Sequence, residues 1–342
     1  MPKMTIEEAI ERVVGRKSLR EAEARAVMEQ IMSGAATPAQ IAALLVALRM
    51  KGETGSELTG FAKVMRSRVV PVPTKRTGLM DTCGTGGDTF KTFNISTAAA
   101  FVAAGAGAVV SKHGNRAVTS RCGSADVLEA LGVNLNLSPE ACGQLLDEVG
   151  IVFLFAPAFH PAMKHAAGPR KEIRLRTVFN LLGPITNPAG AKRQLLGVYD
   201  PRLAGKMAKV LKRLGAERAA VVHGLIGMDE VSPLGPTLVA TVDGRQIEER
   251  VYNLEEFGLK AVSPNEVGPG ESAEENAEIL RRAISDLASP YAQAVLPSAA
   301  VALWVAGLAE TFAEGVERAR DSIRSGAAAR KLDELVKRSQ EL

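Results

Sequence analysis

Three short segments place residues suited to binding anions close to the expected ends of strands. Residues 81–88, DTCGTGGD, hold three glycines in four positions, which lets backbone N–H groups approach a ligand oxygen without a Cβ in the way. Residues 92–97, TFNIST, precede a helix of small residues, whose N-terminal end favours phosphate. Residues 112–116, KHGNR, follow the next expected strand and add positive charge. Taken one at a time, the first segment could be a simple turn, the second a helix cap and the third a solvated basic loop. Because all three are expected at one edge of the sheet, together they predict a binding site for a polyanion.

The same edge gains hydroxyls and a further helix start at Ser120, Gly123 and Ser124. The sequence contains neither the GxxxxGKS/T phosphate loop nor a complete GxGxxG motif. This absence weighs against an ordinary nucleoside triphosphatase or a dinucleotide-binding fold.

An acid pair, Asp229 and Glu230, follows the expected strand at 218–223. Adjacent carboxylates in a loop are suited to Mg²⁺, which keeps some of its waters and bridges protein carboxylates to substrate phosphate. The same dipeptide at 147–148 and 333–334 lies in helical patterns, where a solvated helix face explains it. Only the loop pair follows a strand, so it is the predicted metal site.

Arg170, next to a proline, can offer a planar fork to a carboxylate. Arg174 and Arg176 are instead expected on the exposed face of a helix. His160 and His165 are five residues apart, an awkward spacing for sharing one helix face, and we interpret them as structural. Spacing supports no Ser-His-Asp or Cys-His arrangement, so no catalytic residue is assigned.

Composition narrows the class of protein. The 342 residues are 46% hydrophobic and carry a net charge of +4, so the chain is globular and lacks the charge density of a nonspecific nucleic-acid binder. Its three cysteines match neither a disulfide framework nor a zinc site and indicate a reducing compartment. The acidic N-terminus is unlike a signal peptide, and the longest apolar run, 98–110, is too short to span a membrane. We expect a cytoplasmic protein without membrane or nucleic-acid partners.

Helix-start signals dominate the first 70 residues. Capping boxes are expected at Thr5 with Glu8, Ser18 with Glu21, and Thr37 with Gln40, and a weaker start lies near Ser56. Gly34 and Gly52 are expected to end the second and third helices. The prolines of 70–73, VPVP, favour an extended connection, so we predict a helical domain that ends near residue 72.

Beyond residue 72, short apolar runs alternate with helical patterns, which is typical of βαβ units around a mostly parallel sheet. The last 70 residues are again helical in pattern. The expected strands are 78–82, 106–111, 151–155, 194–199 and 218–223, with a hairpin of 238–242 and 247–252 around an Asp243-Gly244 turn, and the expected helices include 97–104, 125–131 and 202–214.

These motifs, together with GSAD at 123–126 and VFNLLGPITNP at 178–188, closely resemble the anthranilate phosphoribosyltransferase family. The similarity covers essentially the whole chain. It implies an α/β fold of the nucleoside phosphorylase and phosphoribosyltransferase kind, with a small N-terminal helical domain packed on a larger α/β domain. It also implies that a piece of chain near 170–190 returns to the helical domain, which the patterns do not indicate.

The resemblance implies transfer of phosphoribose from 5-phosphoribosyl 1-diphosphate (PRPP) to the amino group of anthranilate, a step of tryptophan biosynthesis that releases diphosphate. It further implies a homodimer, formed through the helical domain. Ser96, Asp229 and Glu230 would hold Mg²⁺, and Gly84, Asn115 and Arg170 would bind anthranilate. PRPP would be surrounded by Gly84, Gly87, Asp88, Thr92, Asn94, Ile95, Ser96, Thr97, Lys112, His113, Gly114, Asn115, Arg116, Ser120 and Ser124.

Two other functions are compatible with this architecture. A pyrimidine nucleoside phosphorylase also has a glycine-rich phosphate loop, but the KHGNR segment and the acid pair favour the transferase. A noncatalytic nucleic-acid-binding relative would use basic patches and aromatic stacking, whereas aromatic residues are only 4% of this chain and its substrate motifs are intact.

Overall fold

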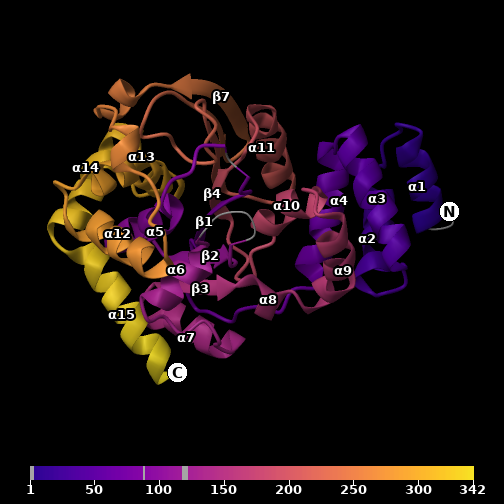
Figure 1. Cartoon of the computed structure of the whole chain (residues 1–342), viewed down its shortest axis with the longest axis horizontal. Helices are drawn as coiled ribbons and strands as arrows, with labels where there is room; N and C mark the ends of the chain where they lie inside the picture. The colour runs from indigo at the N-terminus through magenta and orange to yellow at the C-terminus, as the bar shows by residue number, and fades with distance from the viewer. Residues whose placement is uncertain (1–3, 88, 118–121) are drawn as a thin grey trace.

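The computed structural model describes residues 4–87, 89–117 and 122–342. A helical bundle lies beside a larger α/β domain built on one sheet, and the chain ends on the far side of that domain (Figure 1). Within the described residues the sheet has seven strands in the order β3-β2-β1-β4-β5-β6-β7. The first five in this order are parallel, and the last two pair antiparallel. The strands are β1 (Met80–Gly84), β2 (Val110–Gly114), β3 (Ile151–Phe155), β4 (Arg193–Gly197), β5 (Arg218–Gly224), β6 (Thr237–Asp243) and β7 (Gln246–Tyr252).

Both faces of the sheet are covered, and the alternation of side chains along β5 shows how. Ala220 and Val222 pack in a core with the helices of the C-terminal half, whereas Ala219 and Val221 pack with α11 and the bundle. This explains why β3 and residues 219–222 of β5 are continuously apolar. The helices of this domain are α5 (Ile95–Gly105), α6 (Ser124–Ala130), α7 (Pro139–Glu148), α8 (Ala156–Phe159), α11 (Ala204–Arg213), α12 (Ala273–Ser285), α13 (Pro290–Val305), α14 (Phe312–Arg324) and α15 (Ala327–Glu341).

The small-residue helix α5 lies at the centre of the domain, between the sheet and α13, α14 and α15. Its residues from Thr97 to Ala103 are essentially buried. At its C-terminal end, a Cβ on Gly105 would overlap Ser322 and the backbone of α15, so the helices approach closely there. The alanines and glycines of α5 therefore serve this close packing, which fixes where its N-terminal end lies.

Among the described residues, the helical bundle contains four consecutive helices and two that return to it later in the chain (Figure 1). The returning α9 packs against α2 and α3, and α10 packs against α3 and α4. Ala166, Phe179 and Leu182 from this returning segment are buried in the same apolar core as the first helices. The bundle helices are α1 (Ile6–Val14), α2 (Glu21–Met32), α3 (Pro38–Lys51), α4 (Gly55–Ser67), α9 (Lys164–Ile173) and α10 (Val178–Leu182).

Three of the four expected helix starts are observed, and the start at Ser18 is not. The boxes at Thr5 and Thr37 are confirmed. The box at Ser18 is wrong, because α2 begins at Glu21 and its N-cap is Arg20, whose N–H is accepted by Glu23. The start near Ser56 is a full capping box at Thr54 with Glu57, a Thr-x-x-Glu signal visible in the sequence.

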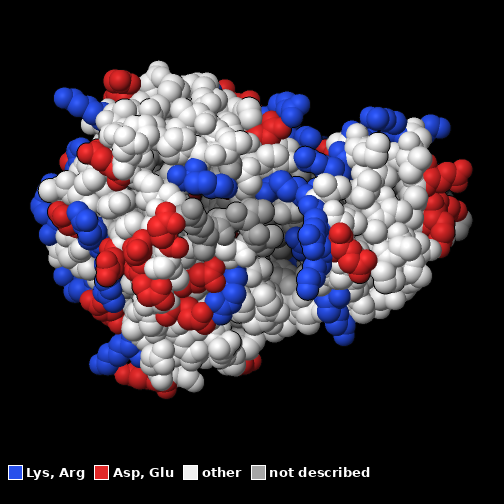
Figure 2. Space-filling view, in the orientation of Figure 1, with Lys and Arg blue, Asp and Glu red and all other residues white. Residues whose placement is uncertain are grey.

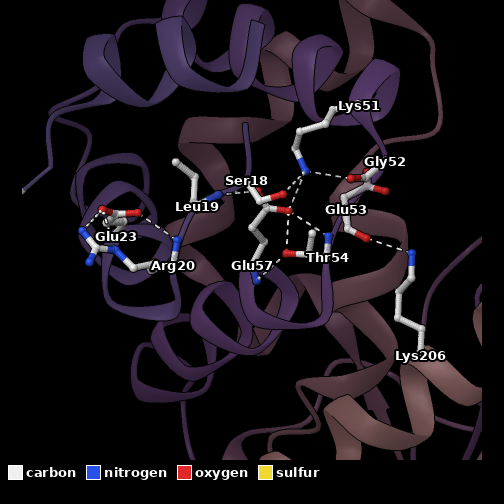
Figure 3. Close-up of polar contacts among 10 residues, drawn as sticks. All are labelled: Ser18, Leu19, Arg20, Glu23, Lys51, Gly52, Glu53, Thr54, Glu57 and Lys206. Carbon is white, nitrogen blue, oxygen red and sulfur yellow. Dashed lines mark hydrogen bonds and ion pairs between the residues drawn. The ribbon is translucent and has the colours of Figure 1, made fainter. Parts of the chain in front are cut away.

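A buried carboxylate accounts for the displaced start of α2 (Figure 3). Glu57, fully buried, accepts hydrogen bonds from Leu19 N at 2.9 Å and Thr54 N at 2.7 Å, and pairs with Lys51 Nζ at 2.9 Å. Ser18 Oγ accepts from the same Lys51 ammonium. The segment before α2 is therefore held by tertiary contacts and is unavailable for capping.

The bundle contacts the α/β domain mainly through α11. Lys206 donates to Glu53 O at 2.8 Å (Figure 3), and Arg66 donates to Ile185 O at 2.8 Å and Leu214 O at 3.0 Å. Burial raises the pKa of Glu53 in this interface. Within the described residues, none of the helices combines the length and apolarity that a membrane crossing requires.

The strand at 151–155, the hairpin and the helical C-terminal region are confirmed, but the first two strands were predicted too early. β1 extends to Gly84 because its full length pairs with β4, and β2 begins at Val110 and extends to Gly114 because it pairs with β3. Lys112 and His113 are consequently inside a strand and buried, which corrects their expected position in a loop.

Candidate active site

The glycine loop leaves the carboxyl end of β1 and is fixed through Thr85. Thr85 N donates to Gly197 O at 2.9 Å, and its hydroxyl accepts from Tyr199 N at 3.1 Å, which ties the loop to the end of β4. Gly86 and Gly87 have φ values of 62° and 83°, a region that side chains disfavour. Positive φ at two consecutive positions turns the loop across the end of the sheet and explains why glycine is needed there.

The acid pair joins this loop to the start of α5. Asp229 Oδ2 accepts from Gly86 N at 2.7 Å, and a Cβ on Gly84 would overlap the same carboxylate. Glu230 Oε1 accepts from Ser96 N at 3.1 Å, and Oε2 accepts from the Ser298 hydroxyl at 3.3 Å. The structure therefore brings the three predicted metal-binding residues together between the end of β1 and the start of α5.

The donor set of this acid pair is compatible with Mg²⁺. Both residues are half-buried, and carboxylate oxygens are the hard donors that Mg²⁺ prefers. Among the described residues, no three His, Cys, Asp or Glu side chains gather as a metal cage. Two carboxylates are the number with which Mg²⁺ is commonly held when a substrate phosphate completes its coordination.

Lys112 lies beneath the start of α5 rather than in a loop. Its ammonium donates to Thr82 O and lies 3.3 Å from both Thr82 Oγ1 and Ser96 Oγ. Burial lowers the pKa of Lys112, and the nearby Asp81 opposes that shift. Asp81 is itself fully buried, and burial raises its pKa to about 6. Lys112 thus supplies positive charge from the floor of the site.

A cavity of about 620 Å³ opens beside the glycine loop, between the α/β domain and the returning helices. Gly84, His113, Asn115, His160 and Arg170 are among its lining residues, with an apolar remainder that includes Met65, Phe179 and Pro184. The three residues expected to bind anthranilate therefore face one cavity. His113 and Gly114, expected around PRPP, line the same cavity.

Two histidines of the cavity are in contact and uncharged near neutral pH. His113 Nε2 and His160 Nε2 are 3.2 Å apart. Burial lowers the pKa of His113 to about 3 and that of His160 to about 4. His160, interpreted from its spacing as structural, is therefore a wall of the cavity, whereas His165 packs against Gly34 of the bundle.

Arg170 comes from α9 and lies over the ring of Phe179, 5.3 Å from its centroid. Burial lowers the pKa of Arg170, although an arginine remains charged at neutral pH. Lys164 lines the cavity as well. Figure 2 shows Lys and Arg side chains gathered along the cleft between the bundle and the α/β domain, so this face of the cleft favours an anion.

Several residues expected around PRPP form ion pairs or hydrogen bonds with other protein groups. Arg116 pairs with Asp126 at 3.0 Å and Glu129 at 2.7 Å on the exposed side of α6. Ser124 Oγ donates to Asn115 O at 3.4 Å, which joins the start of α6 to the end of β2. Asn94 Nδ2 donates to Cys122 O at 3.2 Å.

Two further residues of the NIST segment have buried side chains. Ile95 and Thr97 are at most 1% exposed, so neither side chain is accessible to solvent. Thr92 is half-buried ahead of them. Asp88 and Ser120, expected around PRPP, lie outside the described residues.

Arg176 and Tyr199 are the site residues that the sequence analysis missed. Arg176 was expected on an exposed helix face, but α9 ends at Ile173 and Arg176 is half-buried in the following segment. Its guanidinium lies over the Tyr199 ring, 4.3 Å from the centroid, and Nη2 donates to Thr85 O at 2.8 Å. The left-handed backbone at Arg174, with φ 49°, turns the chain out of the helix.

Comparisons with known proteins agree with this geometry. Residues 7–69 match the model of the helical bundle domain of a glycosyl transferase family, and residues 76–329 match the model of its a/b domain. The anthranilate phosphoribosyltransferase of Moorella thermoacetica is 54% identical over 96% of each chain. That of Geobacter sulfurreducens is 50% identical over 97% of this chain and 98% of its own. The chain belongs to the anthranilate phosphoribosyltransferase family.

Solved structures of the anthranilate phosphoribosyltransferase family share the whole architecture. The enzyme of Thermus thermophilus superposes with a TM-score of 0.91 at 44% identity, covering 97% of this chain and 99% of that one. The Saccharomyces cerevisiae enzyme, in complex with PRPP and Mg, superposes with a TM-score of 0.88 at 27% identity over 98% of both chains. The predicted fold, a small helical domain with a larger and mostly parallel α/β domain, is confirmed.

Proposed function

We propose that this chain transfers the phosphoribosyl group of PRPP to the amino group of anthranilate, giving N-(5-phosphoribosyl)anthranilate and diphosphate. The observation that carries the proposal is the position of Gly84. It lines the cavity that holds Arg170, and it also packs against the Asp229 carboxylate. An acceptor in that cavity and a metal-bound diphosphate at the acid pair would therefore meet at one backbone position.

The chain's own residues divide the binding between these two compartments. Asp229, Glu230 and Ser96 would hold Mg²⁺, which when bound neutralises charge on the departing diphosphate. Lys112 places a further positive charge 3.3 Å from Ser96 Oγ. The N–H groups at the start of α5 are suited to phosphate oxygens. These groups stabilise the leaving group as the bond between the ribose carbon and diphosphate breaks.

Arg170 binds the anthranilate carboxylate in this proposal, and the apolar cavity wall receives the aromatic ring. The aromatic amine is unprotonated at neutral pH, so its lone pair can form the new bond to the ribose carbon without prior removal of a proton. The nitrogen, positively charged once the bond has formed, then loses one proton to give the neutral secondary amine of the product. Positioning is therefore the main requirement on the acceptor side. Burial lowers the pKa of both His113 and His160, so this pair adds no positive charge next to a developing cationic ribose.

The proposed PRPP set keeps the predicted residues. The support is strongest for the glycine loop at the carboxyl end of β1 and for Asn94, Ser96 and Ser124 at the helix starts above the sheet. Lys112 lies inside β2, with its ammonium 3.3 Å from Ser96 Oγ. Asn115 and Gly84 would border both substrates, since both line the cavity.

Anthranilate fluorescence tests the reaction directly. We expect the signal to decay only when the protein, PRPP and Mg²⁺ are all present. A signal that persists under these conditions would contradict the proposal. Phosphate-dependent release of a base from a pyrimidine nucleoside would favour the phosphorylase, and a salt-sensitive shift of DNA in a gel would favour the nucleic-acid-binding relative.

We also propose that the chain is a cytoplasmic homodimer. Its helical domain would consist of residues 1–72 with a piece near 170–190, and the rest of 73–342 would form the catalytic domain. An open groove between α1 and α2 and the exposed Val14 beside it make the bundle a suitable dimer face. Sedimentation analysis of Val14→Glu against the unmodified chain tests this, with dissociation expected for the variant.

A further inference from the structure

Arg176 connects the chain segment that leaves α9 to the glycine loop. Its Nη2 donates to Thr85 O at 2.8 Å, while the guanidinium plane lies over the Tyr199 ring at 4.3 Å. Tyr199 in turn donates its backbone N–H to the Thr85 hydroxyl. Thr85 is 6% exposed and is thus held from three directions, with Gly197 as the third partner. Gly197 ends β4 and Tyr199 follows it closely in the chain, whereas the guanidinium comes from the distant segment after α9.

The guanidinium also lies directly against the turn of the loop. A Cβ on Gly87 would overlap it, so Arg176 fills the space next to the two residues with positive φ. Its Nε is buried and has no hydrogen-bond partner among the described residues. An unpartnered donor on a charged group is costly, and the bond to Thr85 O and the stacking on Tyr199 offset that cost. Stacking on Tyr199 fixes the plane in which the fork can hold the loop.

We propose that Arg176 is a positioning residue that holds residues 85–87 in the conformation that receives the phosphate oxygens of PRPP. This inference rests on the proposed function. Arg176 follows Arg170 by six residues and lies on the segment that joins α9 to α10. The glycine loop, which would bind PRPP, is therefore held by a segment that directly follows α9. The same helix carries Arg170, which would bind anthranilate.

A lysine at this position separates positioning from simple charge. Arg176→Lys keeps the positive charge but removes the planar fork and most of the stacking. We expect calorimetry in the presence of Mg²⁺ to show PRPP binding weakened about tenfold, the cost of about one hydrogen bond to a charged group. Anthranilate affinity should change less than about twofold. Amide hydrogen exchange at residues 85–87 should accelerate in the variant without any ligand.

Two further variants make the test specific. Lys171→Ala removes an exposed charge near the end of α9, just before this segment, and should leave both affinities unchanged. Tyr199→Leu removes the stacking ring without altering the segment, and should weaken PRPP binding in the same direction even if Arg176→Lys folds poorly.

Wild-type PRPP affinity in Arg176→Lys, or equal losses for PRPP and anthranilate, would overturn the inference while leaving the proposed reaction intact. Failure of the unmodified chain to bind PRPP would instead overturn the proposed function, and the inference with it.

Discussion

Replacing Asp229 with asparagine tests the acid pair with little change in shape. In the structure Asp229 Oδ2 accepts the Gly86 N–H at 2.7 Å, so the carboxylate both orients the glycine loop and offers oxygen to Mg²⁺. An asparagine has a single carbonyl oxygen and no charge. It can serve the N–H or the metal well, but not both.

The size of the effect follows from this double role. A hydrogen bond to a charged acceptor contributes about 1.5–3 kcal/mol, which corresponds to about a 10- to 100-fold loss. We expect a loss of this order in kcat/KM for Asp229→Asn, with half-maximal activity shifted to higher Mg²⁺. The melting temperature should be nearly unchanged, since Asp229 is half-buried and its neighbours keep their apolar contacts.

The assay is the decay of anthranilate fluorescence at saturating PRPP across a Mg²⁺ titration. Asp333→Asn is the matched control, because Asp333 and Glu334 form the same dipeptide on the exposed side of α15. Its activity should match the unmodified chain at every Mg²⁺ concentration. Unchanged activity of Asp229→Asn across the titration would refute the assignment of the metal site.

Three further substitutions address the cavity and the bundle. Arg170→Ala should raise the KM for anthranilate far more than that for PRPP, whereas equal changes would contradict its assignment. Glu57→Leu leaves the Lys51 ammonium buried without its carboxylate partner, and should lower the free energy of unfolding of the bundle by about 3–5 kcal/mol. Urea unfolding followed by amide hydrogen exchange of the bundle measures this loss. The control Glu21→Ala removes an exposed ion pair and should cost less than about 1 kcal/mol. Burial lowers the pKa of His160 to about 4 in the folded chain. Between about pH 6.5 and 4 the imidazole therefore binds a proton in the unfolded chain but not in the folded one, so the free energy of unfolding falls as the pH falls. Acidification from pH 7 to 5 should therefore cost the unmodified chain about 2 kcal/mol more than His160→Gln, and equal losses would show that the buried imidazole is not responsible.

The sequence predicts the elements well where local patterns determine them. The strand at 151–155 and the hairpin turn at Asp243-Gly244 depend on apolar runs and turn residues, and both are observed. The end of β2 was misplaced because a lysine followed by a histidine has the appearance of a solvated turn. Lys112 is tolerated inside the strand because Asp81 of β1 and the oxygens of Thr82 compensate its burial, and strand pairing is not visible in local sequence.

The same distinction applies to the candidate site. Glycines, helix caps and an acid pair after a strand are local signals, and the structure brings them to one sheet edge. Arg176 carries no such signal. Its sequence context is a run of basic residues after a helix, which most often belongs to a solvated surface. Only the stacking ring of Tyr199 and the carbonyl of Thr85 reveal its position, and both depend on the tertiary fold.

The glycine loop is the point at which these interactions meet. Through Gly86 it contacts the acid pair, through Thr85 it contacts β4 and Arg176, and through Gly84 it borders the cavity of Arg170. A loop this rich in glycine would be conformationally free on its own, and ordering it costs about 1–2 kcal/mol per residue. The surrounding contacts meet that cost before any substrate binds, so the affinity for the phosphate ligand depends on residues that need not touch it.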